Sequence, residues 1–352
     1  MEFLSEYGLF LAKVITVVIS ILVVIGSIVA AGAKGRKLVH KGHIEVKNLN
    51  EQFSTMTDLL KEAVLDKHDL KLEHKAEKKK LKEEEKAKKK ADKKGEQQDY
   101  KKRVYVLDFD GDIKASAVES LKHEITAVLS MAETKDEIVV RLESGGGMVH
   151  SYGLASSQLA RIKNAGIPLT ITVDRVAASG GYMMACIADK LVAAPFAILG
   201  SIGVVAQVPN FHRLLKDNKI DFEMHTAGEF KRTLTMFGEN TDKARHKFQE
   251  DMEDTHELFK EFVAEYRPKL DVANVATGEV WFGRRAISKD LVDELITSDE
   301  YLSAEAANAD IYEVGYIEKK TLSEKMGMSL QQTIDAVMLK WWNRLQSSQY
   351  FR

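Results

Sequence analysis

Apolar and polar residues recur with two different periods along most of the chain. Short runs rich in β-branched residues predict strands, and longer runs with apolar residues every three to four positions predict helices. The predicted strands cover residues 104–109, 137–142, 169–173, 190–194 and 311–317, and the predicted helices cover 115–132, 148–164, 180–188 and 242–267. Strands that alternate with helices in this order predict an α/β domain of stacked ββα or βαβ units with a largely parallel sheet.

The N-terminus contains one long apolar run. Residues 14–33 carry no charge, and about twenty such residues span the hydrocarbon core of a bilayer as a helix. A cleaved secretory signal is the alternative, because residues 30–33 are small. The acidic leader and the length of the run favour a retained transmembrane anchor. Lys34, Arg36 and Lys37 follow the run, so the positive-inside rule places the rest of the chain in the cytoplasm.

A charged segment separates this anchor from the predicted domain. The apolar spacing of residues 44–70 suits an amphipathic helix or a short packed segment, whereas residues 71–103 are almost all polar or charged. Lysine and glutamate at i, i+4 spacing predict a charged helix or a disordered tether. Acidic residues interrupt the lysines, so a nucleic acid is not expected as a partner.

The C-terminal segment has apolar positions at helical spacing from residue 330 to 345, including Trp341 and Trp342. Such a stripe is typical of a core or a subunit interface, although paired tryptophans also suit a membrane interface. The predicted organisation is an anchor at 1–36, a charged tether at 37–102, a folded α/β domain at 103–318 and an amphipathic helix at 319–352.

Composition removes several classes of site. The net charge of −2 hides an asymmetry, because the lysine-rich tether offsets an acidic remainder. Cys186 is the only cysteine, which excludes an intrachain disulfide and a zinc site built from several thiolates. Its apolar neighbours predict a buried structural thiol.

A glycine turn is the first segment that suggests chemistry. In "RLESGGGMVHSYG", Gly145, Gly146 and Gly147 stand between a predicted buried strand and a helix. Successive glycines permit positive φ and close approach of a ligand, and they leave N–H groups free to point outward. The spacing of dinucleotide-binding and phosphate-binding loops is absent, so no nucleotide cofactor is implied. A tight turn without function is the alternative.

Ser179 is the candidate nucleophile. In "AASGGY" it follows an apolar run and opens a predicted helix, beside the N–H of Gly180. An N-cap serine without catalytic function is the competing interpretation. Gly180 and Gly181 favour the functional interpretation, because small residues leave room for a bulky substrate.

A nucleophilic serine needs a base. The histidines share no motif, but an amine can serve if its surroundings lower its affinity for a proton. Lys231 lies just past a predicted strand and among apolar residues, which include Phe230 and Met236. Most lysines are solvated, so the sequence pattern alone gives weak support to this assignment.

Four segments make the chain recognisable. They are "SGGGMV", "AASGGYMMACIADKLVAAPFAILGSIGVV", "GEFKRTLTMFGENT" and "VATGEVWFGRRAISKDLVDEL". In order and spacing they resemble the motifs of the bacterial signal peptide peptidase A family. The resemblance implies a Clp-protease and crotonase type of fold and a Ser/Lys peptidase without metal or other cofactor. It implies Ser179 as nucleophile, Lys231 as general base, Ser201 as the residue that orients the lysine, and Gly146 and Gly180 as the oxyanion hole.

The resemblance also carries expectations about context. Members often have a proline where this chain has Gly145, so the turn here should be looser. Single-domain members form rings in which neighbouring subunits supply the serine and the lysine, so a cyclic homo-oligomer, an octamer, is expected. The implied substrates are peptides, such as signal-peptide remnants or membrane-derived segments. The implied location is the bacterial inner membrane with a periplasmic catalytic domain, which conflicts with the charge rule.

Two alternatives to a peptidase stay open. An acyl-CoA enzyme of the crotonase type would use the same paired amides, but it would need a catalytic carboxylate and leave Lys231 unexplained. A membrane-tethered scaffold or chaperone with a relic site is the second alternative, and the intact Ser179, Lys231 and Ser201 count against it.

Overall fold

The computed structural model describes residues 42–66, 68–70 and 100–318, together with Lys13, Thr16, Lys75, Lys79 and Lys82. Residues 44–316 form one compact unit. Apart from Thr16, the predicted membrane span at 14–33 lies outside the described residues, as does the predicted helix at 330–345. Within the described part, no helix is both long enough and apolar enough to cross a bilayer.

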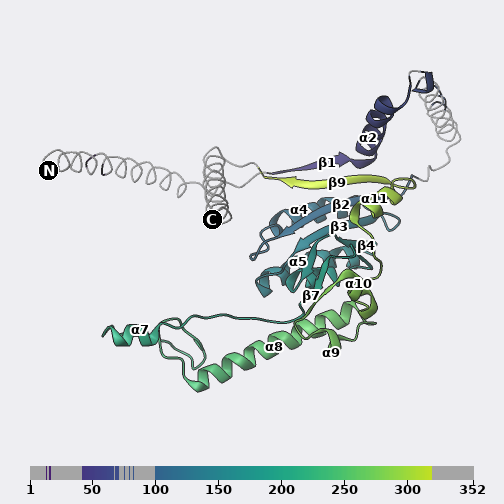
Figure 1. Cartoon of the computed structure of the whole chain (residues 1–352). Coiled ribbons are helices and arrows are strands. Elements are labelled where there is room, and N and C mark those ends of the chain that lie inside the picture. Colours follow the sequence, from purple (N-terminus) through teal and green to yellow (C-terminus); the bar gives the residue numbers. More distant parts are fainter. Residues whose placement is uncertain are drawn as a thin grey trace, which may run out of the picture. The chain divides into compact units, whose positions relative to one another are not determined.

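The compact unit has a mixed α/β architecture (Figure 1). Its elements are β1 (His43–Asn48), α2 (Leu49–Val64), β2 (Arg103–Gly111), α4 (Val118–Leu129), β3 (Glu137–Ser144), α5 (Val149–Asn164), β4 (Leu169–Val173), β5 (Val176–Ala178), α6 (Gly180–Ala185), β6 (Lys190–Ala193), β7 (Ile198–Gly200), α7 (His212–Asp217), α8 (Asp242–Tyr266), α9 (Val272–Val275), β8 (Val280–Phe282), α10 (Gly283–Ala286), a 3-10 turn (Ile287–Lys289), α11 (Ser298–Glu305) and β9 (Asp310–Ile317). The predicted alternation of strands and helices is confirmed.

The sheet is largely parallel and it forks at β3. Its main path runs β1-β9-β2-β3-β5-β7-β8, and β4 and β6 extend from β3 as a second branch. The first half of β3 pairs with β4, whereas its last residue, Ser144, pairs with Ala177 of β5. The fork therefore brings the start of α6, which follows β5, next to the glycine turn that follows β3.

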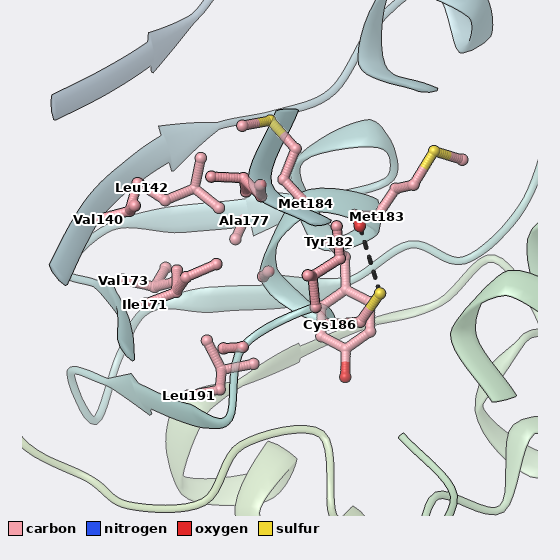
Figure 2. Close-up of a cluster of buried hydrophobic side chains, with 14 of the residues drawn as sticks. Val140, Leu142, Ile171, Val173, Ala177, Tyr182, Met183, Met184, Cys186 and Leu191 are labelled. Atoms are coloured by element: carbon pink, nitrogen blue, oxygen red, sulfur yellow. Dashed lines mark hydrogen bonds between the residues drawn. The ribbon is translucent and has the colours of Figure 1, made fainter. Parts of the chain in front are cut away.

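Two apolar clusters hold the sheet between layers. The larger cluster lies on the face covered by α4, α5 and α6, and the smaller one lies on the opposite face, where Leu49 of α2 and Leu302 of α11 pack against β2 and β3. Cys186 belongs to the larger cluster, and its thiol donates to the Met183 carbonyl at 3.3 Å (Figure 2). Burial raises the pKa of this thiol to about 12, which confirms the prediction of a structural thiol.

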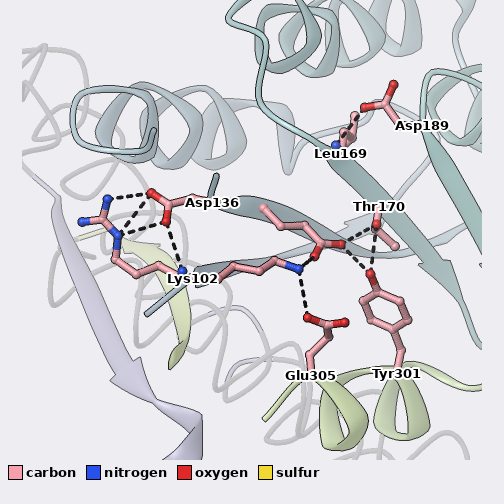
Figure 3. A network of polar contacts seen from close by, with 9 residues as sticks. Lys102, Asp136, Leu169, Thr170, Asp189, Tyr301 and Glu305 are labelled. Atoms are coloured by element: carbon pink, nitrogen blue, oxygen red, sulfur yellow. Dashed lines mark hydrogen bonds and ion pairs between the residues drawn. The ribbon is translucent and has the colours of Figure 1, made fainter. Parts of the chain in front are cut away.

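The buried carboxylate of Glu137 links the N-terminal ends of neighbouring strands. Glu137, at the start of β3, accepts from Thr170 at 2.6 Å and from Tyr301 at 2.5 Å, and it pairs with Lys102 (Figure 3). Lys102 also reaches Glu305 at 2.9 Å. This network joins the residue before β2 to β3, β4 and α11 on the face opposite α4 to α6.

Residues 43–48 correct the prediction for the region before residue 103. The amphipathic helix suggested within residues 44–70 is present as α2, but the chain first forms a strand that was not predicted, β1, beside β9. Ile44 packs against the larger cluster, and the Asn48 side chain caps α2 by accepting from the Glu51 N–H. The compact unit therefore begins near residue 44, well before residue 103.

Residues 203–241, which make up most of the segment between β7 and α8, are called the arm below. Figure 1 shows that it leaves the sheet and carries the short helix α7 beyond the N-terminal end of α8. No residue from 203 to 258 is buried, and the buried residues of α8 are Phe259 and Val263, near its C-terminal end. The arm contains α7 but no strand, so the strand predicted just before Lys231 is wrong.

Candidate active site

Ser179 stands at a strained turn between β5 and α6. Its backbone has φ 52° and ψ −119°, a conformation that residues with a side chain seldom adopt. Two hydrogen bonds hold it: the Ser179 N–H donates to the Gly200 carbonyl at 2.8 Å, and its own carbonyl accepts from Met183 at 2.9 Å. A sharp strand-to-helix turn of this kind presents a serine hydroxyl at the end of a sheet.

The N-cap interpretation of Ser179 is wrong. The serine precedes the first residue of α6, yet its side chain makes no capping hydrogen bond. A capping serine has extended backbone and accepts from an N–H two or three residues ahead, whereas Ser179 has positive φ. Capping of α6 therefore does not explain the strained backbone of Ser179.

Gly146 and Gly180 pack directly against the serine. A Cβ built on Gly146 would lie 2.7 Å from the Gly180 nitrogen and 2.8 Å from the Ser179 Cβ. Gly146 also has φ +87°. Both observations require glycine at position 146, and they place the two candidate oxyanion residues next to each other and to the candidate nucleophile.

The N–H of Gly146 is not free, in contrast to the expectation from the sequence. It donates to the Ser144 hydroxyl at 3.1 Å. That hydroxyl lies 2.5 Å from the hydroxyl of Tyr152, a fully buried residue of α5. One of the two N–H groups predicted to bind the oxyanion is thus hydrogen-bonded to a side chain in this structure.

Ser201 follows the strand next to β5. Ala178 of β5 pairs with Gly200 of β7 in parallel register, so Ser179 and Ser201 both come directly after paired residues. Ser201 also has positive φ, at 53°, and its N–H donates to the Glu279 carbonyl at 2.6 Å. The predicted positioning serine therefore lies at the same sheet end as the nucleophile.

Lys231 is not part of this cluster. It lies exposed in the arm, and its N–H donates to the Gly228 carbonyl at 3.2 Å. Among the residues that the structure describes, its side chain has no hydrogen bond or ion pair. One chain thus brings together Ser179, Gly146, Gly180 and Ser201 but leaves the predicted base apart.

The assembled groups suit attack on a carbonyl. A hydroxyl stands next to backbone N–H groups from two loops, and such donors stabilise the negative charge that forms on a carbonyl oxygen. Sequence reasoning missed Ser144 and Tyr152, because Ser144 reads as a strand end and Tyr152 as one core residue among several on its helix.

Comparison with known proteins gives consistent matches over most of the chain. The model "Peptidase family S49 N-terminal" matches residues 2–159, and "Peptidase family S49" matches residues 161–312. The probable protease SohB of Haemophilus influenzae is 49% identical over 334 residues, covering 94% of each chain. The probable protease SohB of Buchnera aphidicola subsp. Acyrthosiphon pisum is 47% identical over 343 residues, or 97% of this chain and 98% of that protein.

A solved structure was also found, that of a mutant of the 1510-N membrane-bound stomatin-specific protease in complex with a substrate peptide. It is 13% identical, with a TM-score of 0.40, and the match covers 66% of this chain and 99% of that one.

Proposed function

Because the chain belongs to peptidase family S49, we propose that it is a membrane-anchored serine endopeptidase that cleaves peptides through an acyl-enzyme on Ser179. The observation that carries the proposal is the strained backbone of Ser179 with Gly146 and Gly180 packed against it. A strained, uncapped serine beside two loop amides has a clear use in acyl transfer and none in helix capping.

The chemistry follows from these groups. The neutral amine of Lys231 takes the proton of the Ser179 hydroxyl as Oγ attacks the peptide carbonyl carbon. The N–H groups of Gly146 and Gly180 hold the oxyanion. The Lys231 ammonium then protonates the leaving amine, and the C–N bond breaks to give the acyl-enzyme. Lys231 next activates a water molecule, which releases the acid and restores Ser179, while Ser201 orients the lysine.

We place the base of each site on a neighbouring subunit. Lys231 lies in the arm, where none of the residues is buried. The arm exposes many large apolar side chains: Val205, Val208, Phe211, Leu214, Ile220, Phe222, Met224, Phe230, Met236 and Phe237. Exposed apolar surface of this extent is typical of an interface. A cyclic homo-oligomer, an octamer, would cover these side chains and bring each Lys231 to the Ser179 of the next chain.

We assign the fold to the Clp-protease and crotonase type, and the parallel strands that end at the glycine turn and at Ser179 support this assignment.

The anchor at residues 14–33 would hold the enzyme in the bacterial inner membrane, where membrane-derived peptides are available. The charges after residue 33 favour a cytoplasmic domain, and analogy with the family favours a periplasmic one. The activity of alkaline phosphatase fused to the C-terminus distinguishes the two orientations, because this reporter is active only in the periplasm.

Labelling by a fluorophosphonate probe tests the nucleophile. We expect the full-length protein to be labelled and to hydrolyse an internally quenched apolar peptide, and Ser179→Ala to do neither. Lys231→Ala should also abolish hydrolysis, because the nucleophile and the base act as a unit. Ser201→Ala should be milder, because it displaces the base without removing it.

The rivals make different predictions in the same assays. A scaffold with a relic site would show no hydrolysis and no labelling in the unmodified protein. A crotonase-type enzyme would act on an acyl-CoA thioester and would not lose that activity in Lys231→Ala. Hydrolysis that survives in Ser179→Ala would reject the proposal.

A further inference from the structure

Two hydroxyl groups beneath the glycine turn take no part in the proposed mechanism. Ser144 ends β3, and Tyr152 lies in the first turns of α5. We propose that Tyr152 and Ser144 are positioning residues that fix the oxyanion turn, residues 144–147, for catalysis. This inference deepens the proposed peptidase function and rests on it.

The hydrogen bonds form a chain with a defined direction. The Tyr152 hydroxyl donates its single proton to the Asp112 carbonyl at 2.8 Å. The Ser144 hydroxyl, 2.5 Å away, must then donate to the Tyr152 oxygen. The Ser144 oxygen is left as the acceptor for the Gly146 N–H at 3.1 Å. The orientation of this amide is therefore set by a buried tyrosine through one serine.

Tyr152 also contacts the other side of the candidate site. A Cβ on Gly180 would lie 2.4 Å from the Tyr152 ring. A Cβ on Gly111 would lie 2.5 Å from the Tyr152 hydroxyl and 2.4 Å from the Ser144 hydroxyl. One side chain thus contacts the loop after β2, the end of β3 and the start of α6.

The glycine turn needs such a support. Three consecutive glycines have the largest conformational entropy that a turn can have, whereas oxyanion donors act only when they are fixed before the reaction. Gly145 has open space around it and no positive φ, so nothing at that position restrains the turn. The hydrogen bond from Gly146 to Ser144 joins two neutral groups, and a charged oxyanion is the stronger acceptor. The Ser144 hydroxyl can thus hold the Gly146 N–H in place before the reaction, and the same N–H can then donate to the oxyanion.

Matched hydroxyl deletions test the inference on the full-length protein. Tyr152→Phe and Ser144→Ala should each lower kcat about tenfold to a hundredfold on an internally quenched apolar peptide, with KM changed less than about threefold, because the donors act on the transition state. The controls are Tyr105→Phe and Ser156→Ala. Both remove a buried hydroxyl that has no hydrogen-bond partner among the described residues, and Ser156 lies in the same helix as Tyr152. The controls should keep wild-type kcat.

A second measurement does not depend on activity. Amide hydrogen exchange in residues 144–148 should become faster in Tyr152→Phe and stay unchanged in Tyr105→Phe. Adding Gly145→Pro to Ser144→Ala should restore part of kcat, since proline restricts the same turn from the backbone. If exchange and kcat in Tyr152→Phe match the Tyr105→Phe control, the positioning role is rejected. If the unmodified protein hydrolyses no peptide but exchange responds as expected, the peptidase proposal fails and the hydrogen-bond chain stands.

Discussion

At the scale of single residues, backbone conformation marks the candidate site more clearly than side-chain contacts do. Ser179 and Ser201 are two of the five non-glycine residues with positive φ among the described residues, and they directly follow neighbouring parallel strands. The sequence pattern pointed to Ser179 and the N–H of Gly180, because glycines that follow a serine after a strand have few structural uses, and the resemblance to the peptidase family implied the role of Gly146. It could not predict Ser144 and Tyr152, whose importance comes from contacts across three loops.

Gly146→Ala tests the close approach at the serine. A methyl group would lie 2.7 Å from the Gly180 nitrogen, at a position with φ +87°, so the turn must move away from Ser179. We expect kcat to fall about a hundredfold to a thousandfold. Gly153→Ala is the control, because Gly153 has open space around it inside α5, and it should retain wild-type kcat. Equal activity of the two variants would show that Gly146 is not needed for catalysis.

Glu124 of α4 predicts a pH dependence of stability. Its side chain is 5% exposed, one oxygen accepts from the Tyr316 N–H at 2.8 Å, and the other has no hydrogen-bond partner among the described residues. Burial raises its pKa from 4.5 to about 7. Between these two values the unfolded chain loses a proton that the folded chain retains, so Glu124 favours unfolding increasingly as the pH rises.

Glu124→Gln removes this titration. Relative to the wild type, the variant should gain about 2 kcal/mol in free energy of unfolding between about pH 5 and about pH 8. Urea unfolding at both pH values measures the change, and Glu119→Gln on the exposed face of the same helix is the control. A difference between variant and wild type that stays constant with pH would contradict the prediction.

At the scale of elements, the hydrophobic periodicity predicted the long strands and helices because each buries a regular face. The strands β5, β7 and β8 have three residues each, too few for a period to appear, yet β5 and β7 position Ser179 and Ser201. The strand β1 was predicted as part of an amphipathic helix or a short packed segment, because its apolar residues precede the amphipathic pattern of α2 without a break.

The carboxylate network around Glu137 should stabilise these strand beginnings. Glu137 is 4% exposed and accepts from Thr170, Tyr301 and Lys102. Glu137→Ala leaves buried donors unpaired, and it should lower the free energy of unfolding by about 3 kcal/mol. Glu119→Ala, which removes an exposed pair with Lys122, should cost less than about 1 kcal/mol. Comparable losses in chemical denaturation would contradict a special role for the network.

At the scale of the whole molecule, the arm is the feature that the sequence did not predict. The motif around Lys231 suggested a strand and an apolar environment, but the structure places these residues in a segment without strands, on exposed surface. Apolar residues at a subunit interface and in a core have the same sequence signature, so periodicity cannot distinguish them.

Mixing two inactive variants tests whether the site is shared. Under the shared-site proposal, Ser179→Ala and Lys231→Ala are each inactive alone, but some mixed interfaces pair an intact serine with an intact lysine. Subunits dissociated, mixed and reassembled should regain part of the wild-type activity against the quenched peptide. Variants reassembled separately and then combined without exchange are the control, and they should stay inactive. A monomer that is fully active at low concentration would place both residues in one chain.

Placing the base in the arm of a neighbouring subunit would also control when proteolysis begins in the cell. If the base belongs to a neighbour, a newly synthesised chain holds a poised serine and no means of using it. Catalysis would then begin only when copies meet, and its rate would rise more steeply than in proportion to their number. Assembly of the subunits would thus prevent premature proteolysis, as a removable pro-segment does in other proteases.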